Sequence, residues 1–234
     1  MPRAEEAIVL VGGLGTRLRS EVGALPKPLA PVAGRPFLAF LLDRLAEAGI
    51  RRTLLATGYG AAQIEAAIGK RWQDMAIDYS VEPEPLGTGG AIALAARSLH
   101  GGEAHVMNGD TFLRFDPSGL ERSVREQGAA MGMALASVAD VSRYGAVEVE
   151  AGRVRRFREK GGDGEGLINA GSYFLTAEAF AACPRDAAFS FEETVLRPLA
   201  DAGRVAAYLD TSDFIDIGVP DDYRLAQTRF AAGA

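Results

Sequence analysis

The chain has 234 residues, of which 28 are glycine, and a formal net charge of −6 at pH 7. This length suits one large α/β domain or two small ones. A hydrophobic content of 48% with 24% charged residues is ordinary for a globular protein. The negative charge argues against a general nucleic-acid or membrane surface, because such surfaces need a basic face. No stretch approaches the ~18 apolar residues of a membrane span, so any anion site is expected to be local.

Cysteine and histidine usage points away from disulfides and metal clusters of those residues. Cys183 is the single cysteine, so no internal disulfide can form and a cytoplasmic location is expected. The two histidines, His100 and His105, have no cysteine or histidine partner at metal-ligand spacing.

A glycine-rich turn after the first expected strand is the first candidate site. Residues 8–11 form an apolar run that ends at Gly12, Gly13 and Gly15, and Arg17 follows. Backbone without Cβ atoms approaches a polyphosphate closely and points its N–H groups at the anion. An arginine adds a bidentate fork. The same turn would also serve as a plain tight strand-to-helix connection.

Two familiar phosphate loops do not fit this turn. A dinucleotide fingerprint needs a glycine at position 18, where this chain has leucine. It also needs an acidic residue at the end of the next strand, and the strand expected over residues 54–57 ends without one. A Walker loop needs Gly-Lys-Ser/Thr, which is absent. What remains is an arginine-bearing loop, with Lys27 placed between Pro26 and Pro28 as a point charge on a stiffened segment.

Strands and helices are expected to alternate after this turn. Apolar spacing predicts a helix over residues 36–48, which Gly49 ends with a left-handed cap. Strands over 53–57 and 76–81 flank a helix over 61–68. This order predicts an α/β, Rossmann-like, mostly parallel sheet with helices on both faces and a ligand crevice at the strand ends.

Residues 82–91 form a second candidate site at that crevice. Their prolines stiffen an extended loop, and their glycines are expected to let a flat ligand lie against the backbone, before a helix that begins near Ala91. The residues concerned are Pro83, Pro85, Gly87, Gly89 and Gly90. The alternative is a plain strand-to-helix loop, although Gly-Thr-Gly-Gly at a helix start is also a natural anion seat.

Two aspartates are candidates for a cation site. Asp110 follows a strand within 105–110, at a position where a metal that bridges phosphates would be held. It would equally suit a helix N-cap, because Pro117 and a helix follow. Asp216 stands between two isoleucines in an apolar strand, where an uncompensated acid would be costly, so it needs a cation or a hydrogen-bond partner.

A β-rich region over residues 129–175 has a different pattern from the rest of the chain. Strands are expected over 131–138, 144–150, 154–160 and 167–175. One interpretation is an insertion that covers a sheet edge. The other is a polar pocket for a hydroxylated substrate, in which Glu159 and Asn169 bind hydroxyl groups and Lys160 binds a phosphate.

Taken together in order, these segments resemble the sugar-1-phosphate nucleotidylyltransferase family. The matching motifs are Gly12-Gly-Leu-Gly-Thr-Arg-Leu18, Pro26-Lys-Pro28, Glu84-Pro-Leu-Gly-Thr-Gly-Gly90, Asn108-Gly-Asp110, Tyr144-Gly145, Glu159-Lys160, Asn169-Ala-Gly171 and Asp216-Ile-Gly218. The start and the length are most similar to members that guanylylate a heptose 1-phosphate for bacterial surface polysaccharides. One departure is Gly161-Gly162, where many members have proline after the Glu-Lys pair.

The resemblance implies that a sugar 1-phosphate attacks the α-phosphorus of a nucleoside triphosphate, with Mg²⁺ as the cofactor and GTP as the expected donor. The implied catalytic residues are Arg17, Lys27, Asp110, Lys160 and Asp216, with Asp110 and Asp216 as metal ligands. The implied nucleotide-binding residues are Leu10, Gly12, Gly13, Gly15, Thr16, Glu82, Pro85, Leu86, Gly87 and Thr88. The implied sugar-binding residues are Gly145, Glu159 and Asn169.

A single nucleotidyltransferase domain over residues 1–234 is expected, with a nucleotide-binding part over 1–128, a sugar-binding part over 129–175 and a return to the sheet over 176–234. No nucleic-acid or membrane partner is expected, and a homodimer is compatible with the resemblance.

The base and the sugar stay open at this stage. A carboxylate at Glu82 would accept from guanine N1–H and its 2-amino group together, whereas uracil offers one donor between two acceptors. Glu84 could serve instead. Alternatives are therefore uridylyl or other nucleotidylyl transfer to mannose, glucose or N-acetylmuramate 1-phosphate, and a nucleotide-sugar binding subunit without catalysis.

Overall fold

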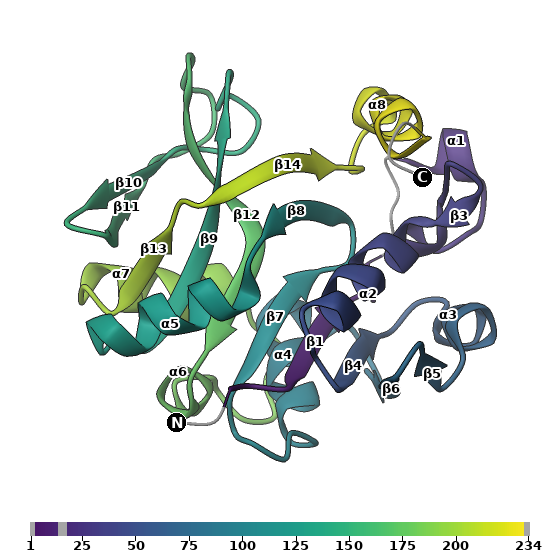
Figure 1. Cartoon of the computed structure of the whole chain (residues 1–234), viewed down its shortest axis with the longest axis horizontal. Coiled ribbons are helices and arrows are strands. Elements are labelled where there is room, and N and C mark those ends of the chain that lie inside the picture. The colour runs from purple at the N-terminus through teal and green to yellow at the C-terminus, as the bar shows by residue number, and fades with distance from the viewer. Residues whose placement is uncertain (1–2, 14–17, 232–234) are drawn as a thin grey trace.

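The computed structural model describes residues 3–13 and 18–231 of the chain. Its centre is a ten-stranded sheet with the order β10-β11-β13-β9-β12-β7-β1-β4-β6-β5 (Figure 1). These strands are β1 Glu6–Leu10, β4 Arg52–Thr57, β5 Arg71–Trp72, β6 Met75–Val81, β7 Ala104–Asn108, β9 Met131–Val138, β10 Val147–Glu150, β11 Arg153–Phe157, β12 Gly166–Leu175 and β13 Val205–Tyr208.

Most strands of this sheet run in one direction. Parallel pairs join β7, β1, β4 and β6, and another joins β9 to β13. β12 lies antiparallel to both β7 and β9, so β7 and β9 run in the same direction. β5 at one edge of the sheet and β11 near the other edge run, like β12, opposite to the remaining strands. The predicted α/β class with a mostly parallel sheet is confirmed.

Helices cover both faces of the sheet, as predicted. One apolar core receives side chains from α2 Phe37–Glu47, α3 Ala61–Ile68, α5 Pro117–Gln127 and α8 Pro220–Ala231. The other receives them from α4 Gly87–Ala96, α6 Ala177–Ala181 and α7 Arg197–Asp201. Successive side chains of a strand point to opposite faces, so β1 contributes Ala7 and Val9 to the first core and Ile8 to the second.

Helix α2 shows how closely local sequence determined these elements. Its apolar residues are buried along one face, Leu41, Leu42 and Leu45 among them. The chain leaves the helix at Gly49, whose φ is +80°, so the predicted left-handed cap is confirmed. Helix α3 has the predicted bounds.

The β-rich region joins the central sheet as β9 to β12. β9 has its predicted bounds, but β10 and β11 are shorter than expected. Tyr144 and Gly145 lie in a turn instead, with both N–H groups donating to Val141 O. Glu159 and Lys160 likewise follow the end of β11 in a loop. The shortening therefore moves these predicted sugar-site residues from strands into loops.

A separate two-stranded ladder brings the end of the chain back across the sheet. β14 Thr211–Asp216 pairs antiparallel with β8 Thr111–Phe115, and Figure 1 shows β14 leading from β13 toward α8. The remaining short elements are α1 Arg19–Val22, a 3₁₀ turn Lys27–Leu29, the hairpin β2 Pro31–Val32 with β3 Arg35–Pro36, and a π-helical turn Glu192–Leu196.

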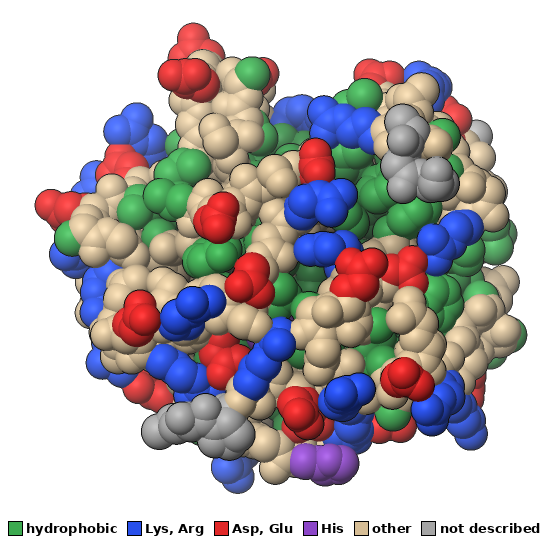
Figure 2. Space-filling model, in the orientation of Figure 1, with side chains coloured by type: hydrophobic (Ala, Val, Ile, Leu, Met, Phe, Trp, Pro, Cys, Tyr) green, Lys and Arg blue, Asp and Glu red, His purple; other side chains and the backbone are tan. Residues whose placement is uncertain are grey.

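Surface charge and helix length are two general features of the fold. On the face in Figure 2, acidic and basic side chains are interspersed rather than gathered into one basic patch. Within residues 3–13 and 18–231, no helix combines the length and the apolar character that crossing a bilayer requires.

Candidate active site

The carboxyl ends of four parallel strands meet at one edge of the sheet. Leu10 at the end of β1 is in register with Ala56 of β4 and with Asn108 at the end of β7. Thr57 of β4 is in register with Val81 of β6. Loops that leave neighbouring parallel strands at one edge form a ligand crevice, and two cavities open here.

The first cavity, of about 460 Å³, gathers most of the predicted nucleotide-binding residues. It is lined by Leu10, Gly12, Gly13, Glu82, Pro85, Gly87 and Thr88 from that set, together with Ala56, Gly58, Tyr59, Pro83, Glu84 and Ala91. Gly15, Thr16 and Arg17 lie outside the described residues. We call this the nucleotide cavity.

Glu82 shapes the loop that borders the nucleotide cavity. Its Oε2 accepts a hydrogen bond of 2.8 Å from the backbone N–H of Leu86, and its own N–H donates to Thr57 O. Leu86 thus contributes through its backbone rather than by lining the cavity. A Cβ on Gly12 would lie 3.0 Å from Glu82 Oε1, so glycine allows this close approach.

The glycines of residues 87–90 have a different role from the predicted one. A Cβ on Gly87 would lie 2.7 Å from Phe189 O, a Cβ on Gly89 would overlap the Phe189 ring, and a Cβ on Gly90 would lie 2.8 Å from Ala187 O. Protein, rather than a flat ligand, fills the space that these glycines leave. The expectation that a flat ligand lies against the backbone was therefore wrong for Gly89 and Gly90, because both are buried by protein atoms.

Helix α4 also begins earlier than predicted, at Gly87 rather than near Ala91. The Gly89 N–H in its first turn donates to Phe189 O, and Phe189 N–H donates to Leu86 O. Thr88 Oγ1 accepts from Phe191 N–H at 3.1 Å. Segment 187–191 thus stabilises a helix start that its glycines alone would disfavour.

Lys27, Asp110 and Asp216 converge beside these cavities. Lys27 Nζ lies 2.6 Å from Asp110 Oδ2 and 3.7 Å from Asp216 Oδ1. The lysine comes from the 3₁₀ turn, Asp110 from the turn after β7, and Asp216 from the end of β14. The β8–β14 ladder aligns them, because Asp216 is in register with Thr111 and Ile217 N–H donates to Asp110 O. Asp110 is not the N-cap of the following helix, since Asp116 fills that position.

The charges of this cluster do not balance. Two carboxylates face one ammonium, and the Lys27 side chain is only 10% exposed. Burial raises the pKa of Asp216, and the neighbouring charge of Asp110 raises it further, whereas Lys27 and the Gly218 N–H lower it. Carboxylate oxygens are the ligands that Mg²⁺ prefers, so the residues present fit a divalent cation.

The protein would supply only part of the coordination of such a cation. In the part of the chain that the structure describes, no group of three or more His, Cys, Asp or Glu side chains is placed to hold a metal. Mg²⁺ in phosphate-transferring sites is held by one or two carboxylates, substrate phosphates and water, which matches a pair of aspartates.

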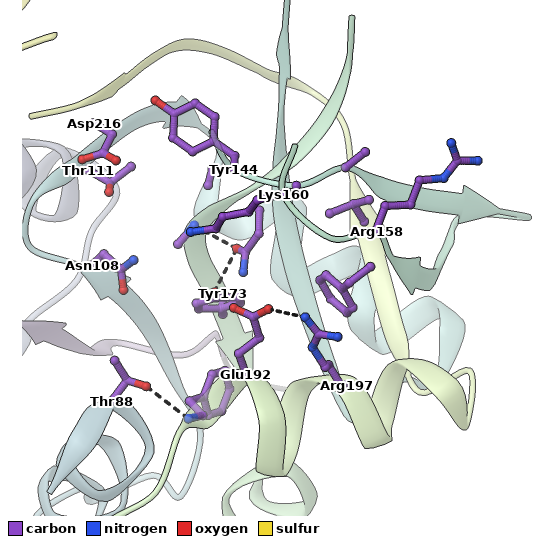
Figure 3. Close-up of a pocket in the computed structure, with 18 of the residues that line it drawn as sticks. Thr88, Asn108, Thr111, Tyr144, Arg158, Lys160, Tyr173, Glu192, Arg197 and Asp216 are labelled. Carbon is purple, nitrogen blue, oxygen red and sulfur yellow. Dashed lines mark hydrogen bonds and ion pairs between the residues drawn. The ribbon is translucent and has the colours of Figure 1, made fainter. Parts of the chain in front are cut away.

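The second cavity, of about 550 Å³, contains the predicted sugar-site residues. Gly145, Glu159, Lys160 and Asn169 all line it, and so does Asp216 (Figure 3). Leu10 and Thr88 line both cavities, so the two are contiguous. We call this the sugar cavity.

Hydrogen bonds hold the polar groups of the sugar cavity in place. Asn169 Oδ1 accepts from Tyr173 OH at 2.9 Å and from Gly171 N–H at 3.0 Å. Gly171, at φ +66°, lies where the β12–β9 register shifts, and this irregularity re-aims Asn169. Burial, and next the charge of Asp216, raise the pKa of Tyr144 to about 12, so its phenol stays protonated and can donate.

Several lining residues were missed by sequence reasoning. Glu192 and Arg197 bring further charge into the sugar cavity, and Thr111 and Tyr173 bring hydroxyl groups (Figure 3). Arg158 also lines the cavity, but its guanidinium points away from it toward Glu148. Asn108 and Tyr144 lay inside recognised motifs without a predicted role. For Thr111, its position next to Asp110 was a weak indication that it lies in the site. Nothing in the local pattern marked Glu192 or Arg197.

A family model described as nucleotidyl transferase matches residues 6–232. This chain belongs to the nucleotidyl transferase family. The resemblance deduced from the motifs is therefore confirmed, as is the predicted enzyme class. A binding subunit without catalysis is set aside, because the family assignment and the convergent acids both favour catalysis.

Relatives of this nucleotidyltransferase are similar over almost their whole length. The D-glycero-α-D-manno-heptose 1-phosphate guanylyltransferase of Aneurinibacillus thermoaerophilus is 42% identical over 223 residues, which cover 95% of this chain and 96% of that protein. The enzyme of the same name from Campylobacter jejuni is 41% identical over 219 residues, or 93% and 96% of the two chains. Among solved structures, HddC from Yersinia pseudotuberculosis complexed with GMP-PN matches with a TM-score of 0.84 and 35% identity over 97% of this chain and 99% of that one.

Proposed function

We propose that this nucleotidyltransferase transfers GMP from GTP to D-glycero-α-D-manno-heptose 1-phosphate, giving a GDP-heptose and pyrophosphate for the synthesis of a surface polysaccharide. The convergence of Lys27, Asp110 and Asp216 beside two contiguous cavities supports the chemistry. Identities of 42% and 41% to two heptose 1-phosphate guanylyltransferases support the choice of substrates.

The reaction requires positioning and charge neutralisation rather than a protein base. An oxygen of the sugar phosphate forms a bond to the α-phosphorus of GTP, and the bond from that phosphorus to pyrophosphate breaks. A phosphate monoester has its second pKa near ~6, so the attacking oxygen is largely ionised at pH 7. Catalysis of this type depends on in-line placement and on offsetting the negative charge of the phosphates.

Lys27 would supply fixed positive charge at the reacting phosphates. Its ammonium has three N–H donors. One donates to Asp110 Oδ2 at 2.6 Å, and Asp216 Oδ1 at 3.7 Å is a charged neighbour beyond hydrogen-bonding distance. Donors therefore remain for an oxygen of the α-phosphate. Arg17, with Gly15 and Thr16, is proposed to bind the departing pyrophosphate.

Asp110 and Asp216 would hold Mg²⁺. When bound, the ion offsets the charge of the phosphate oxygens and orients them for in-line attack. In its absence, the two carboxylates and the substrate phosphates would repel one another in a partly buried site.

The polar residues of the sugar cavity would bind both the phosphate and the ring hydroxyls of the sugar 1-phosphate. Lys160 is proposed to contact the sugar phosphate, and Glu159, Asn169 and the Gly145 backbone to contact ring hydroxyls. The Asn169 carbonyl oxygen is engaged by Tyr173 and Gly171, so its amide N–H groups are those directed to substrate. Gly145 has φ +81°, and a Cβ there would lie 2.6 Å from Arg158 O, which explains a glycine at this position.

Pyrophosphate release tests the proposal. The purified protein is given Mg²⁺, each of four nucleoside triphosphates, and the 1-phosphates of heptose, mannose, glucose and N-acetylmuramate. We expect the highest kcat/KM with GTP and the heptose, with the GDP-heptose identified by mass. Comparable turnover with UTP would remove the choice of guanine, and faster turnover of another sugar would replace the heptose.

Three further expectations are retained as proposals. A cytoplasmic location is compatible with a lone, buried Cys183, whose thiol pKa burial raises to about 11. The division into parts over 1–128, 129–175 and 176–234 assigns the nucleotide cavity to the first and much of the sugar cavity to the second. A homodimer is tested by light scattering of the purified protein.

A further inference from the structure

The sugar cavity extends beyond the predicted sugar-binding residues to a second charged pair. Glu192 and Arg197 line it on the side away from Asp216 (Figure 3), with Arg197 Nη2 3.1 Å from Glu192 Oε1. The Arg197 guanidinium also lies over the ring of Phe157, 5.6 Å from its centroid. This contact restricts where the guanidinium can point.

A π-helical turn brings these two side chains together. In an α-helix, residues five apart project about 140° from each other. Here the Arg197 N–H donates to Glu192 O, five residues back, so the wider π-turn stacks the two positions. Single π-turns inside helices are frequently found at functional sites.

The sequence supplies a cause for this turn. Pro198 has no N–H to donate to Thr194 O, four residues back, and a proline ring inside an α-helix collides with that carbonyl. Widening the turn that precedes Pro198 relieves the collision. The proline therefore makes the Glu192–Arg197 arrangement a property of this segment.

Stability alone does not account for the pair. The Glu192 and Arg197 side chains are 47% and 36% exposed, and ion pairs of such exposure contribute about 0–1 kcal/mol. Arg197 also has a second partner that lies outside the cavity, Glu193, 3.2 Å from its Nε. The Glu193 contact is an ion pair in which Arg197 Nε makes no hydrogen bond with a described residue, whereas Arg197 Nη2 donates to Glu192 Oε1. The arginine therefore orients the carboxylate inside the cavity, and the small stability of an exposed pair does not explain why that carboxylate is there.

We propose that Glu192, held in place by Arg197, determines specificity for the two-carbon side chain of the heptose, a role that rests on the proposed function. A heptose 1-phosphate in its pyranose form carries a C6–C7 diol, whereas mannose 1-phosphate carries one C6 hydroxyl. With the phosphate beside Lys160 and Asp216, the side chain extends toward the opposite end of the cavity. A carboxylate accepts hydrogen bonds from both hydroxyls of a diol, and the arginine fork fixes its orientation.

The variant Glu192→Gln tests this role, with Glu193→Gln as the matched control, because both glutamates contact Arg197 and only Glu192 lines the cavity. We expect Glu192→Gln to lower kcat/KM for heptose 1-phosphate about 10- to 100-fold, the loss of a charged hydrogen bond to substrate. The KM for GTP should not change. Glu193→Gln should behave as wild type.

Mannose 1-phosphate used as a competitor separates side-chain recognition from a general loss of sugar binding. Its inhibition constant should change less in Glu192→Gln than kcat/KM for the heptose. Wild-type kinetics in Glu192→Gln, equal losses in both variants, or equal losses for both sugars would each overturn the role. If the wild-type enzyme itself fails to use heptose 1-phosphate, the proposed function falls, and this role falls with it.

Discussion

Asp110 and Asp216 contact the same ammonium group, that of Lys27, at 2.6 and 3.7 Å. Asp110 lies in the turn between β7 and β8 and Asp216 at the end of β14, and the β8–β14 pairing brings the two acids together. Among the described residues, the two carboxylates belong to no other ion pair, so this buried lysine is their one ion-pair partner, and we expect the three side chains to act together in the proposed reaction.

Replacing this lysine should therefore affect catalysis strongly. In Lys27→Met the substrate phosphates lose a fixed positive charge, and kcat should fall about 10²- to 10³-fold. The unfolding free energy should fall by about 1–3 kcal/mol, because Asp110 loses its donor. Steady-state kinetics and urea unfolding measure both. Turnover within a few-fold of wild type would remove Lys27 from the reaction.

Base selection is expected to depend on Glu82. The variant Glu82→Gln should lower kcat/KM for GTP about 10-fold or more and narrow the preference for GTP over UTP, because an amide cannot accept from both guanine donors. Glu84→Gln is the matched comparison, since Glu84 lines the same cavity. A loss of GTP preference confined to Glu84→Gln would transfer base recognition to that residue.

The contact between Gly89 and Phe189 makes a prediction about stability. Gly89→Ala should destabilise the protein by about 1–3 kcal/mol, the usual cost of overpacking, because the new Cβ overlaps the Phe189 ring. In a Phe189→Ala background the same change should cost much less. Denaturant unfolding of both single variants and the double variant measures the coupling, and additive effects would contradict the packing role given to this glycine.

His105 is expected to make the free energy of unfolding depend on pH below neutrality. Its ring is fully buried and neither nitrogen has a hydrogen-bond partner among the described residues. Burial lowers its pKa to about 3 from 6.5, with a smaller contribution from the charge of Arg3. The folded state therefore binds fewer protons than the unfolded state between these values. Its contribution to stability is complete above pH 6.5 and is lost as the pH falls toward 3.

The wild type should accordingly lose up to about 1.4 kcal/mol per pH unit over that range relative to His105→Leu. Urea unfolding at several pH values gives the difference. His100→Leu, in which the replaced side chain is 79% exposed, serves as the control. Parallel stability profiles for wild type and His105→Leu would contradict the assignment.

Local sequence predicted the elements with strong periodicity and the motifs that surround the site. β9, α2 and α3 were found at or near their expected bounds because apolar spacing and glycine caps act within a few residues. The loops at the strand ends also lie where parallel pairing places them. Leu10, Glu82 and Thr88 thus line one cavity, although their roles remain predictions.

What failed depended on contacts between distant segments. The glycines of residues 87–90 were interpreted through their own loop, whereas Phe189 determines why they are needed. The convergence of Asp110 and Asp216 was implied by the family resemblance and not by any local pattern, because it depends on the pairing of β8 with β14. Glu192 and Arg197 meet through a π-turn, and helical periodicity would have placed them on different faces.

Pyrophosphate release by Asp110→Asn, compared with wild type at saturating GTP, heptose 1-phosphate and Mg²⁺, tests most directly whether this acid acts at the reacting phosphorus. The account predicts that release falls at least about 10²- to 10³-fold, while circular dichroism and the unfolding midpoint show a folded protein. Release at the wild-type rate by folded Asp110→Asn would contradict it.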